Sequence, residues 1–186
     1  MKTLGQFVLQ GAGQCVEYIE APVKRTEALI RNGMLDGDLM RTKIWADQNV
    51  DTVVYVPTPL YQDEIVAVFV KPLSQSLGSL NDLRSKRVVI TSGHRWAEAQ
   101  LMQRGITPVM ASTYGHFMEH IHFGKVDVGL IEKSSLPMLG EEPNVMTKVI
   151  SPIQFHIVLR KEHEDLVPSL DTALKRIKAQ FGLMQN

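Results

Sequence analysis

The chain has 186 residues, of which 44% are apolar, and it carries 20 Lys+Arg against 20 Asp+Glu. This length and apolar content predict one ordinary globular domain or two small lobes, and they exclude a disordered chain. A net charge of zero offers no basic excess for nucleic acid and no acidic tail, so a small-molecule binder or enzyme is favoured over a DNA-binding protein.

Strand and helix patterns alternate along the chain, separated by glycine, proline and polar residues. The first part predicts a strand at 14–20, a helix at 23–32, a strand at 35–40, a helix at 42–48, a strand at 52–56 and a long apolar strand at 64–71. A polar loop at 72–79 is followed by a short capped helix before 87, a strand at 87–91, a helix at 96–104, a strand at 107–110 and a helix at 116–123. The last part predicts a strand at 126–131, a short helix at 134–139, strands at 145–149 and 154–159, and a helix at 163–181 closed by Gly182. This order predicts βαβ units with a parallel or mixed sheet, which is an α/β fold.

One ten-residue pattern occurs twice. "IRNGMLDGDL" begins at Ile30 and "IHFGKVDVGL" begins at Ile121. Each reads as a helix end, a glycine C-cap and then a strand preceded by an aspartate, Asp36 or Asp127. The repeat indicates two α/β lobes of similar build, although a glycine and an aspartate after a helix are also common by chance.

The stretch "VVITSGHRWAEAQL", from Val88 to Leu101, is a strand that leads into a helix through a glycine turn. Backbone N–H groups at the start of such a helix suit a carboxylate or another anion. The alternative is a turn without a ligand, because the motif alone is weakly specific.

Four stretches in this order resemble the extracellular solute-binding proteins of the polar amino acid ABC-transporter type. They are "RTEALIRNGMLDGDL", "SLNDLRSKRVVITSGHRWAEAQL", "HFGKVDVGLIEKSSL" and "FHIVLRKEHEDLVPSLDTALKRIK", and the likeness extends roughly from Gly11 to Gly182. The resemblance implies a type II periplasmic-binding-protein-like fold, with two three-layer α/β lobes joined by crossing strands at 65–71 and 154–160. Lobe one would comprise residues 1–70 and 154–186, and lobe two residues 71–153, with the ligand in the cleft between them.

The resemblance also implies a binding role rather than catalysis, with no cofactor, no metal and no nucleic acid. The residues that it places around the ligand are Arg41, Tyr61, Gly93, His94, Arg95, Trp96 and Glu132. The turn at Gly93–Arg95 would hold the ligand's carboxylate, and Glu132 its ammonium group. The ligand would be an amino acid or a small carboxylate, and the partner a membrane permease or a sensor. A periplasmic location follows if a leader is absent from this sequence, and a cytoplasmic one if the gene starts here.

The family's first strand, which lies inside the sheet of lobe one, has no counterpart in this sequence. Its absence would expose unpaired backbone groups unless a neighbouring chain supplies the edge. Two other functions stay open. One is the effector-binding domain of a cytosolic LysR-type transcription regulator, although no helix-turn-helix segment is present. The other is a small-molecule enzyme on the same scaffold, although no convincing acid–base pair is found.

Several further residues are considered as metal ligands, as a reactive thiol or as parts of the core. His116 and His120 are spaced to share one helix face beside Glu119, which suits zinc, but surface or packing roles are favoured because a third ligand is not evident. Cys15 is expected to be a buried thiol within a strand, and Trp45 a core residue. The longest apolar stretch, "IVAVFV" at 65–70, is too short to span a bilayer.

Overall fold

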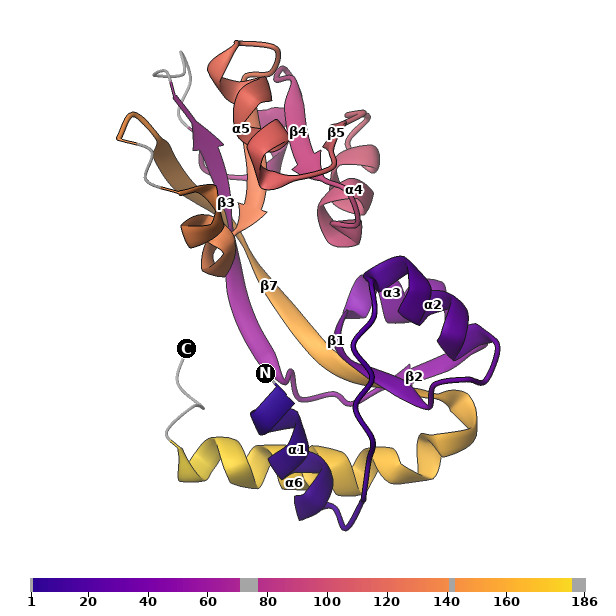
Figure 1. Cartoon of the computed structure of the whole chain (residues 1–186). Coiled ribbons are helices and arrows are strands. Elements are labelled where there is room, and N and C mark those ends of the chain that lie inside the picture. Colours follow the sequence, from indigo (N-terminus) through magenta and orange to yellow (C-terminus); the bar gives the residue numbers. More distant parts are fainter. Residues whose placement is uncertain (1, 71–76, 141–142, 182–186) are drawn as a thin grey trace. The chain divides into compact units, whose positions relative to one another are not determined.

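The computed structural model describes residues 2–70, 77–140 and 143–181 (Figure 1). The chain divides into two compact units, Met1–Gln62 with Gln154–Asn186, and Asp63–Ile153. The first division therefore falls within a strand and earlier than the predicted boundary at residue 70. The predicted polar loop at 72–79 lies largely outside the described residues, as do the predicted ends of two elements, Lys71 and Gly182.

The described part of the first unit contains five helices, two strands of its own and parts of two long strands that continue into the second unit. They are α1 (Lys2–Gly11), α2 (Val23–Arg31), β1 (Gly37–Thr42), α3 (Lys43–Gln48), β2 (Val53–Tyr55), the start of β3 (Tyr61–Phe69), the end of β7 (Met146–Arg160), the 3₁₀ helix η3 (Lys161–Leu166) and α6 (Val167–Gln180). β1 and β2 both pair antiparallel with β7, with Gly37 opposite Leu159 and Val53 opposite Arg160. The three strands thus form a small antiparallel sheet.

Two helices supply the main apolar cover of this sheet. α1 packs against α6, and the two lie side by side in Figure 1. Their apolar faces bury Val8 and Leu9 from α1 and Leu170 and Leu174 from α6 against Ile157 of β7. α1 is an element that the sequence analysis did not predict. Its apolar residues are interrupted by glycine and glutamine, so the helix depends on this packing rather than on local propensity.

The second unit is built around the ordered strands β3, β6, β4 and β5, with β6 at Val128–Glu132, β4 at Val88–Thr91 and β5 at Val109–Ala111. β4 runs parallel to both β5 and β6, whereas β3 is antiparallel to β6. The helices are η1 (Leu80–Leu83), α4 (Arg95–Met102), α5 (Tyr114–His122) and η2 (Lys133–Leu139). The parallel arrangement places the carboxyl ends of β4 and β6 at the same edge of the sheet.

The core of the second unit depends on one glycine. Phe117 and Ile121 of α5 are fully or almost fully buried and pack over β6 at Gly129. A Cβ atom at Gly129 would lie 2.7 Å from Cε2 of Phe117 and 2.9 Å from Cδ1 of Ile121. The absence of a side chain therefore lets the helix approach the sheet closely.

The repeated pattern forms the same structure in both units. At the first, Gly33 donates to Ile30 at 3.1 Å and the next residue donates to Leu29 at 2.8 Å. At the second, Gly124 donates to Ile121 at 3.1 Å and the next residue donates to His120 at 3.0 Å. Both glycines have positive φ, 71° and 64°. These are two Schellman motifs, and they confirm that the repeat has a structural basis.

The structure differs from the predicted elements in three places. Residues 14–20 form no strand in the structure, because the candidate strand lacks a paired neighbour. The predicted strands at 145–149 and 154–159 are one continuous strand, β7, which passes through Pro152. The predicted final helix begins instead as η3, where His163 breaks the helical dihedrals before α6. No helix in the described ranges is long and apolar enough to cross a membrane.

Candidate functional site

The turn after β4 positions a helix start without a side-chain cap. Gly93 has φ of 95°, a conformation that favours glycine, and the N–H of His94 donates to the Thr91 carbonyl at 3.1 Å. α4 then begins at Arg95, and no side chain accepts a hydrogen bond at its N-terminus. The N–H of Arg95 donates to the Gly93 carbonyl at 2.8 Å, so the N–H groups that follow it in the first turn of this eight-residue helix are the ones that suit an anion.

Glu132 reaches the same edge of the sheet because it ends β6, the strand beside β4. Its Oε1 atom lies 3.5 Å from Nε2 of His94. The His94 side chain is 3% exposed and that of Glu132 is 23% exposed. The structure thus brings a buried imidazole, a half-buried carboxylate and a helix N-terminus together within one unit.

The charge state of His94 depends on two opposing effects. Burial lowers the pKa of His94, and the nearby Glu132 carboxylate raises it by a smaller amount. The net direction is downward, so the imidazole is neutral at neutral pH. Its buried Nε2 makes no hydrogen bond with any described residue. A neutral imidazole in this place leaves the Glu132 carboxylate without a full cationic partner.

Two neighbours complete the turn. The ring of Trp96 stacks near that of His94, with centroids 6.5 Å apart and planes inclined by 30°. Arg95 is exposed, and its Nη1 lies 3.4 Å from Oε2 of Glu98. Trp96 therefore lies beside His94 at the turn, and its contact with a ligand stays a prediction. Arg95 lies at the solvent-facing start of α4.

The sequence analysis did not predict the ion pair between Lys133 and Glu64, which lies next to Glu132 along the chain. The Lys133 ammonium group lies 2.5 Å from Oε2 of Glu64, and the N–H of Ser134 donates to Asp63 at 3.2 Å. Both contacts follow from the antiparallel register that places Ile65 opposite Glu132. No local signal in the sequence could have paired residues so far apart. Because Lys133 is held by Glu64, it does not neutralise Glu132.

Arg41, in the first unit, is an interior residue of that unit. Its guanidinium contacts the Asp38 carboxylate at 2.9 Å, Glu27 at 3.3 Å and the Val23 carbonyl at 3.1 Å. It also donates to the Thr26 hydroxyl and lies 4.6 Å from the centroid of the Trp45 ring. The Arg41 side chain is 5% exposed. Because it is buried and bonded on several sides, a structural role is favoured. A role in ligand binding stays a prediction.

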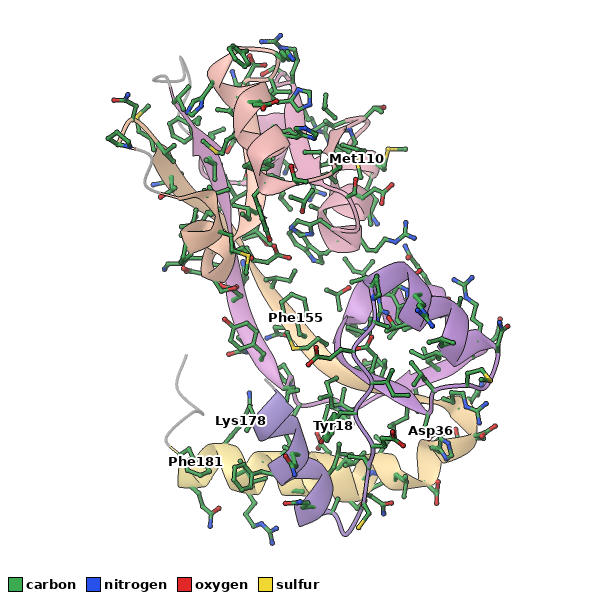
Figure 2. All side chains as sticks on the ribbon, viewed as in Figure 1. Tyr18, Asp36, Met110, Phe155, Lys178 and Phe181 are labelled. Atoms are coloured by element: carbon green, nitrogen blue, oxygen red, sulfur yellow. The ribbon has the colours of Figure 1, made fainter. Side chains whose placement is uncertain are left out.

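Tyr61 also belongs to the first unit, where it stacks on Phe155 with ring centroids 6.2 Å apart; Phe155 is labelled in Figure 2. The pairing joins the two long strands β3 and β7. Of the predicted ligand-binding residues, the second unit brings together Gly93, His94, Arg95, Trp96 and Glu132. Arg41 and Tyr61 lie in the other unit, and their contribution to a ligand site stays a prediction.

The remaining candidates have ordinary surroundings. Nδ1 of His116 lies 2.8 Å from the Ser112 hydroxyl, and no group of three or more metal-ligating side chains occurs in the described part of the chain. Trp45 is buried, as predicted. Cys15 is exposed, which contradicts the prediction of a buried thiol. The error has the same origin as the missing strand at 14–20, because without sheet pairing this segment is not covered.

Among the comparisons with known proteins, only the comparison with solved structures finds matches, and these concern the fold. No protein-family model matches the chain, and no curated protein sequence does. Among solved structures, holo ArgBP from T. maritima matches with a TM-score of 0.68 and 17% identity, covering 95% of this chain and 79% of that one. AbpA, an amino acid ABC transporter substrate-binding protein from Streptococcus pneumoniae bound to L-arginine, matches with a TM-score of 0.65 and 17% identity, covering 96% and 77%. An ancestral arginine-binding protein bound to glutamine matches with a TM-score of 0.65 and 18% identity, covering 95% and 80%.

These neighbours confirm the predicted fold class, the α/β fold of the type II substrate-binding proteins. They also confirm that the structure resembles amino acid ABC transporter substrate-binding proteins, as the sequence stretches indicated. At identities of 17–18% the likeness concerns the fold. Function has to be argued from the side chains of the site.

Proposed function

We propose that the chain binds a small amino-acid-like solute at the turn between β4 and α4. The observation that carries the proposal is the meeting of Glu132 with the uncapped start of α4, with His94 3.5 Å from the carboxylate. A zwitterion carries the two charges that these groups complement. The neighbours support this class of ligand, because they are named as binding arginine or glutamine.

Each group has a distinct role in this proposal. The ligand's carboxylate accepts hydrogen bonds from the first-turn N–H groups of α4, where the helix dipole also favours negative charge. Arg95 adds a positive charge beside that position. The ligand's ammonium group binds Glu132, which lacks a full cationic partner while His94 is neutral. The exposed part of Trp96 provides an apolar surface for the aliphatic part of the ligand.

The wider role follows from the same neighbours. Delivery of the solute to a membrane permease of an ABC transporter is the role that the name of AbpA supports, and a sensor is the alternative partner. Such a protein works outside the cytoplasmic membrane. The function is binding and release without a chemical step.

The test is a calorimetric titration of the purified chain with arginine and glutamine. Each is compared with an analogue that lacks one charge, such as agmatine, which is arginine without its carboxylate. We expect binding of an amino acid and loss of at least tenfold in affinity for the analogue. Glu132→Gln should cost a similar factor, whereas Glu119→Gln, on the exposed face of α5, should not. Equal binding by Glu132→Gln and the unchanged chain would refute the assignment.

A further inference from the structure

The first unit contains an open sheet edge. β1 is the last strand of its sheet and pairs with β7 on one side, and no described strand pairs with its other side. The segment Cys15–Ala21, which precedes β1 in the chain, belongs to no helix or strand. Both line a cavity of about 590 Å³. Because this segment forms no strand, it does not continue the sheet beyond β1.

The open side has the length of one strand. The six residues of β1 extend over about 20 Å, at about 3.3 Å per residue. Along it, the N–H of Met40 donates to the Asp38 carboxylate at 2.9 Å. A side chain therefore occupies a donor that a neighbouring strand would otherwise use. The other outward-facing N–H and C=O groups of an edge strand are a template for strand addition, and an added strand would have to displace the bond of Met40 to Asp38.

The cavity is lined by apolar side chains, both at its buried walls and at its exposed rim. Leu9, Ile157 and Leu159 line it and belong to the buried core of this unit. Its rim exposes large apolar side chains that elsewhere would be covered. These are Val16 at 44% exposure, Ile19 at 56%, Val23 at 45% and Met34 at 70%. Apolar side chains gathered at one exposed place indicate a surface that a partner covers.

The charges around the cavity are mostly negative. Glu17, Glu20, Asp36 and Asp38 line it, against Arg41 alone among cationic residues of the described lining. Arg41 is already bonded to Asp38 and to Glu27. Tyr18 and Asp36, which both line the cavity, are labelled in Figure 2. The excess of carboxylates favours an occupant with basic residues.

We propose that this cavity binds an extended segment of another polypeptide, which adds to β1 as a strand. The segment has β-branched apolar residues along its middle and lysine or arginine at its ends. Main-chain hydrogen bonds to β1 provide affinity, while the apolar rim and the carboxylates select the side chains, as in other cases of strand addition. This interaction is separate from solute binding, because it uses residues of the first unit and the solute site uses those of the second.

Cys15 makes the proposal testable. It is the single cysteine of the chain, it is exposed and it lines the cavity. The probe is the synthetic peptide KVTVTVK with blocked ends, added to the full chain while the alkylation of the thiol is followed by mass spectrometry. We expect saturating peptide to slow alkylation at least tenfold and to raise the melting temperature. The peptide KVTPTVK, whose proline removes a backbone donor, and the charge-reversed EVTVTVE should do neither.

A pair of matched variants tests the charge argument. Glu17→Gln combined with Glu20→Gln should weaken binding of KVTVTVK at least fivefold without unfolding the chain, because both residues are exposed. Glu119→Gln combined with Glu164→Gln removes the same charge elsewhere and should leave binding unchanged. Alkylation at the full rate in saturating peptide would overturn the proposal. So would a dimer in which the thiol is already protected without peptide, since a second copy would then fill the cavity.

Discussion

Nε2 of His94 lies 3.5 Å from Oε1 of Glu132, although the two residues belong to different strand ends of the second unit. His94 is the residue just before α4, where we expect the ligand's carboxylate to bind. Glu132 ends β6, where we expect its ammonium group to bind. The contact couples the charge state of the imidazole to the carboxylate that we expect to bind an ammonium group.

The first prediction concerns this coupling. In Glu132→Gln the carboxylate that raises the pKa of His94 is gone, while the burial that lowers it remains. We therefore expect the pKa of His94 to fall further below its ordinary value. An NMR titration of the imidazole resonances measures it directly. The pKa should not move in Glu119→Gln, and a rise in Glu132→Gln would show that the carboxylate does not act on the imidazole as described.

The second prediction is a loss of stability in mild acid. Burial lowers the pKa of His94, and burial is also the main cause that lowers the pKa of His156. As the pH falls through about 6.5, the unfolded chain binds protons at these residues and the folded chain does not. The free energy of unfolding should therefore decrease from pH 7.5 towards pH 5.5, as measured by urea denaturation. The variant His156→Gln should show a flatter dependence, and an unchanged slope would contradict this account.

The third prediction concerns the interior of the first unit. Arg41→Met removes a buried cationic partner of Glu27, whose side chain is 9% exposed, and of Asp38. Breaking a buried ion pair commonly costs about 3–5 kcal/mol, because the remaining charge is left without compensation. Urea unfolding should reveal a loss of that order. The added change Glu27→Gln should recover part of it, and Arg31→Met, at an exposed arginine with one long hydrogen bond to Asn49, should cost little.

The fourth prediction concerns the close approach of α5 to β6. Gly129→Ala places a methyl group against Phe117 and Ile121, both buried. Overpacking of this kind costs about 1–3 kcal/mol. The control is Gly115→Ala in the first turn of α5, where the added Cβ meets only Oγ1 of Thr113 at 3.7 Å. That change should be neutral or stabilising, so similar melting temperatures for the two variants would argue against the described packing.

The fifth prediction compares the two repeated helix ends. Gly33 and Gly124 have nearly the same positive φ, so alanine should cost about 1–2 kcal/mol of backbone strain at either position. A Cβ at Gly124 meets nothing within 4 Å, whereas one at Gly33 would displace the Arg160 guanidinium, the end of a flexible side chain, and add the small cost of moving it. Gly33→Ala should therefore destabilise the chain more than Gly124→Ala in chemical denaturation. The reverse order would indicate that the two motifs differ in a way that their hydrogen bonds do not reveal.

Local signals in the sequence were enough for much of the fold. The alternation of strands and helices, the glycine that turns β4 into α4 and the two glycine C-caps depend on residues within a few positions of one another. Backbone sterics and hydrophobic periodicity act at that range. These features therefore predicted the α/β class, the position of the turn at Gly93 and the two matching helix ends at Gly33 and Gly124.

Contacts between distant residues decided the rest. A strand exists only where another strand pairs with it, so the pattern at 14–20 could not predict that this segment would remain unpaired. The bond of Arg41 to Glu27 depends on how α2 packs beside β1, and the local sequence does not specify it. The approach of His94 to Glu132 requires β4 and β6 to lie parallel and adjacent. The sequence alone therefore determined which residue types reach the turn, and the tertiary structure determined which charges meet there, because burial and pairing are properties of neighbours in space.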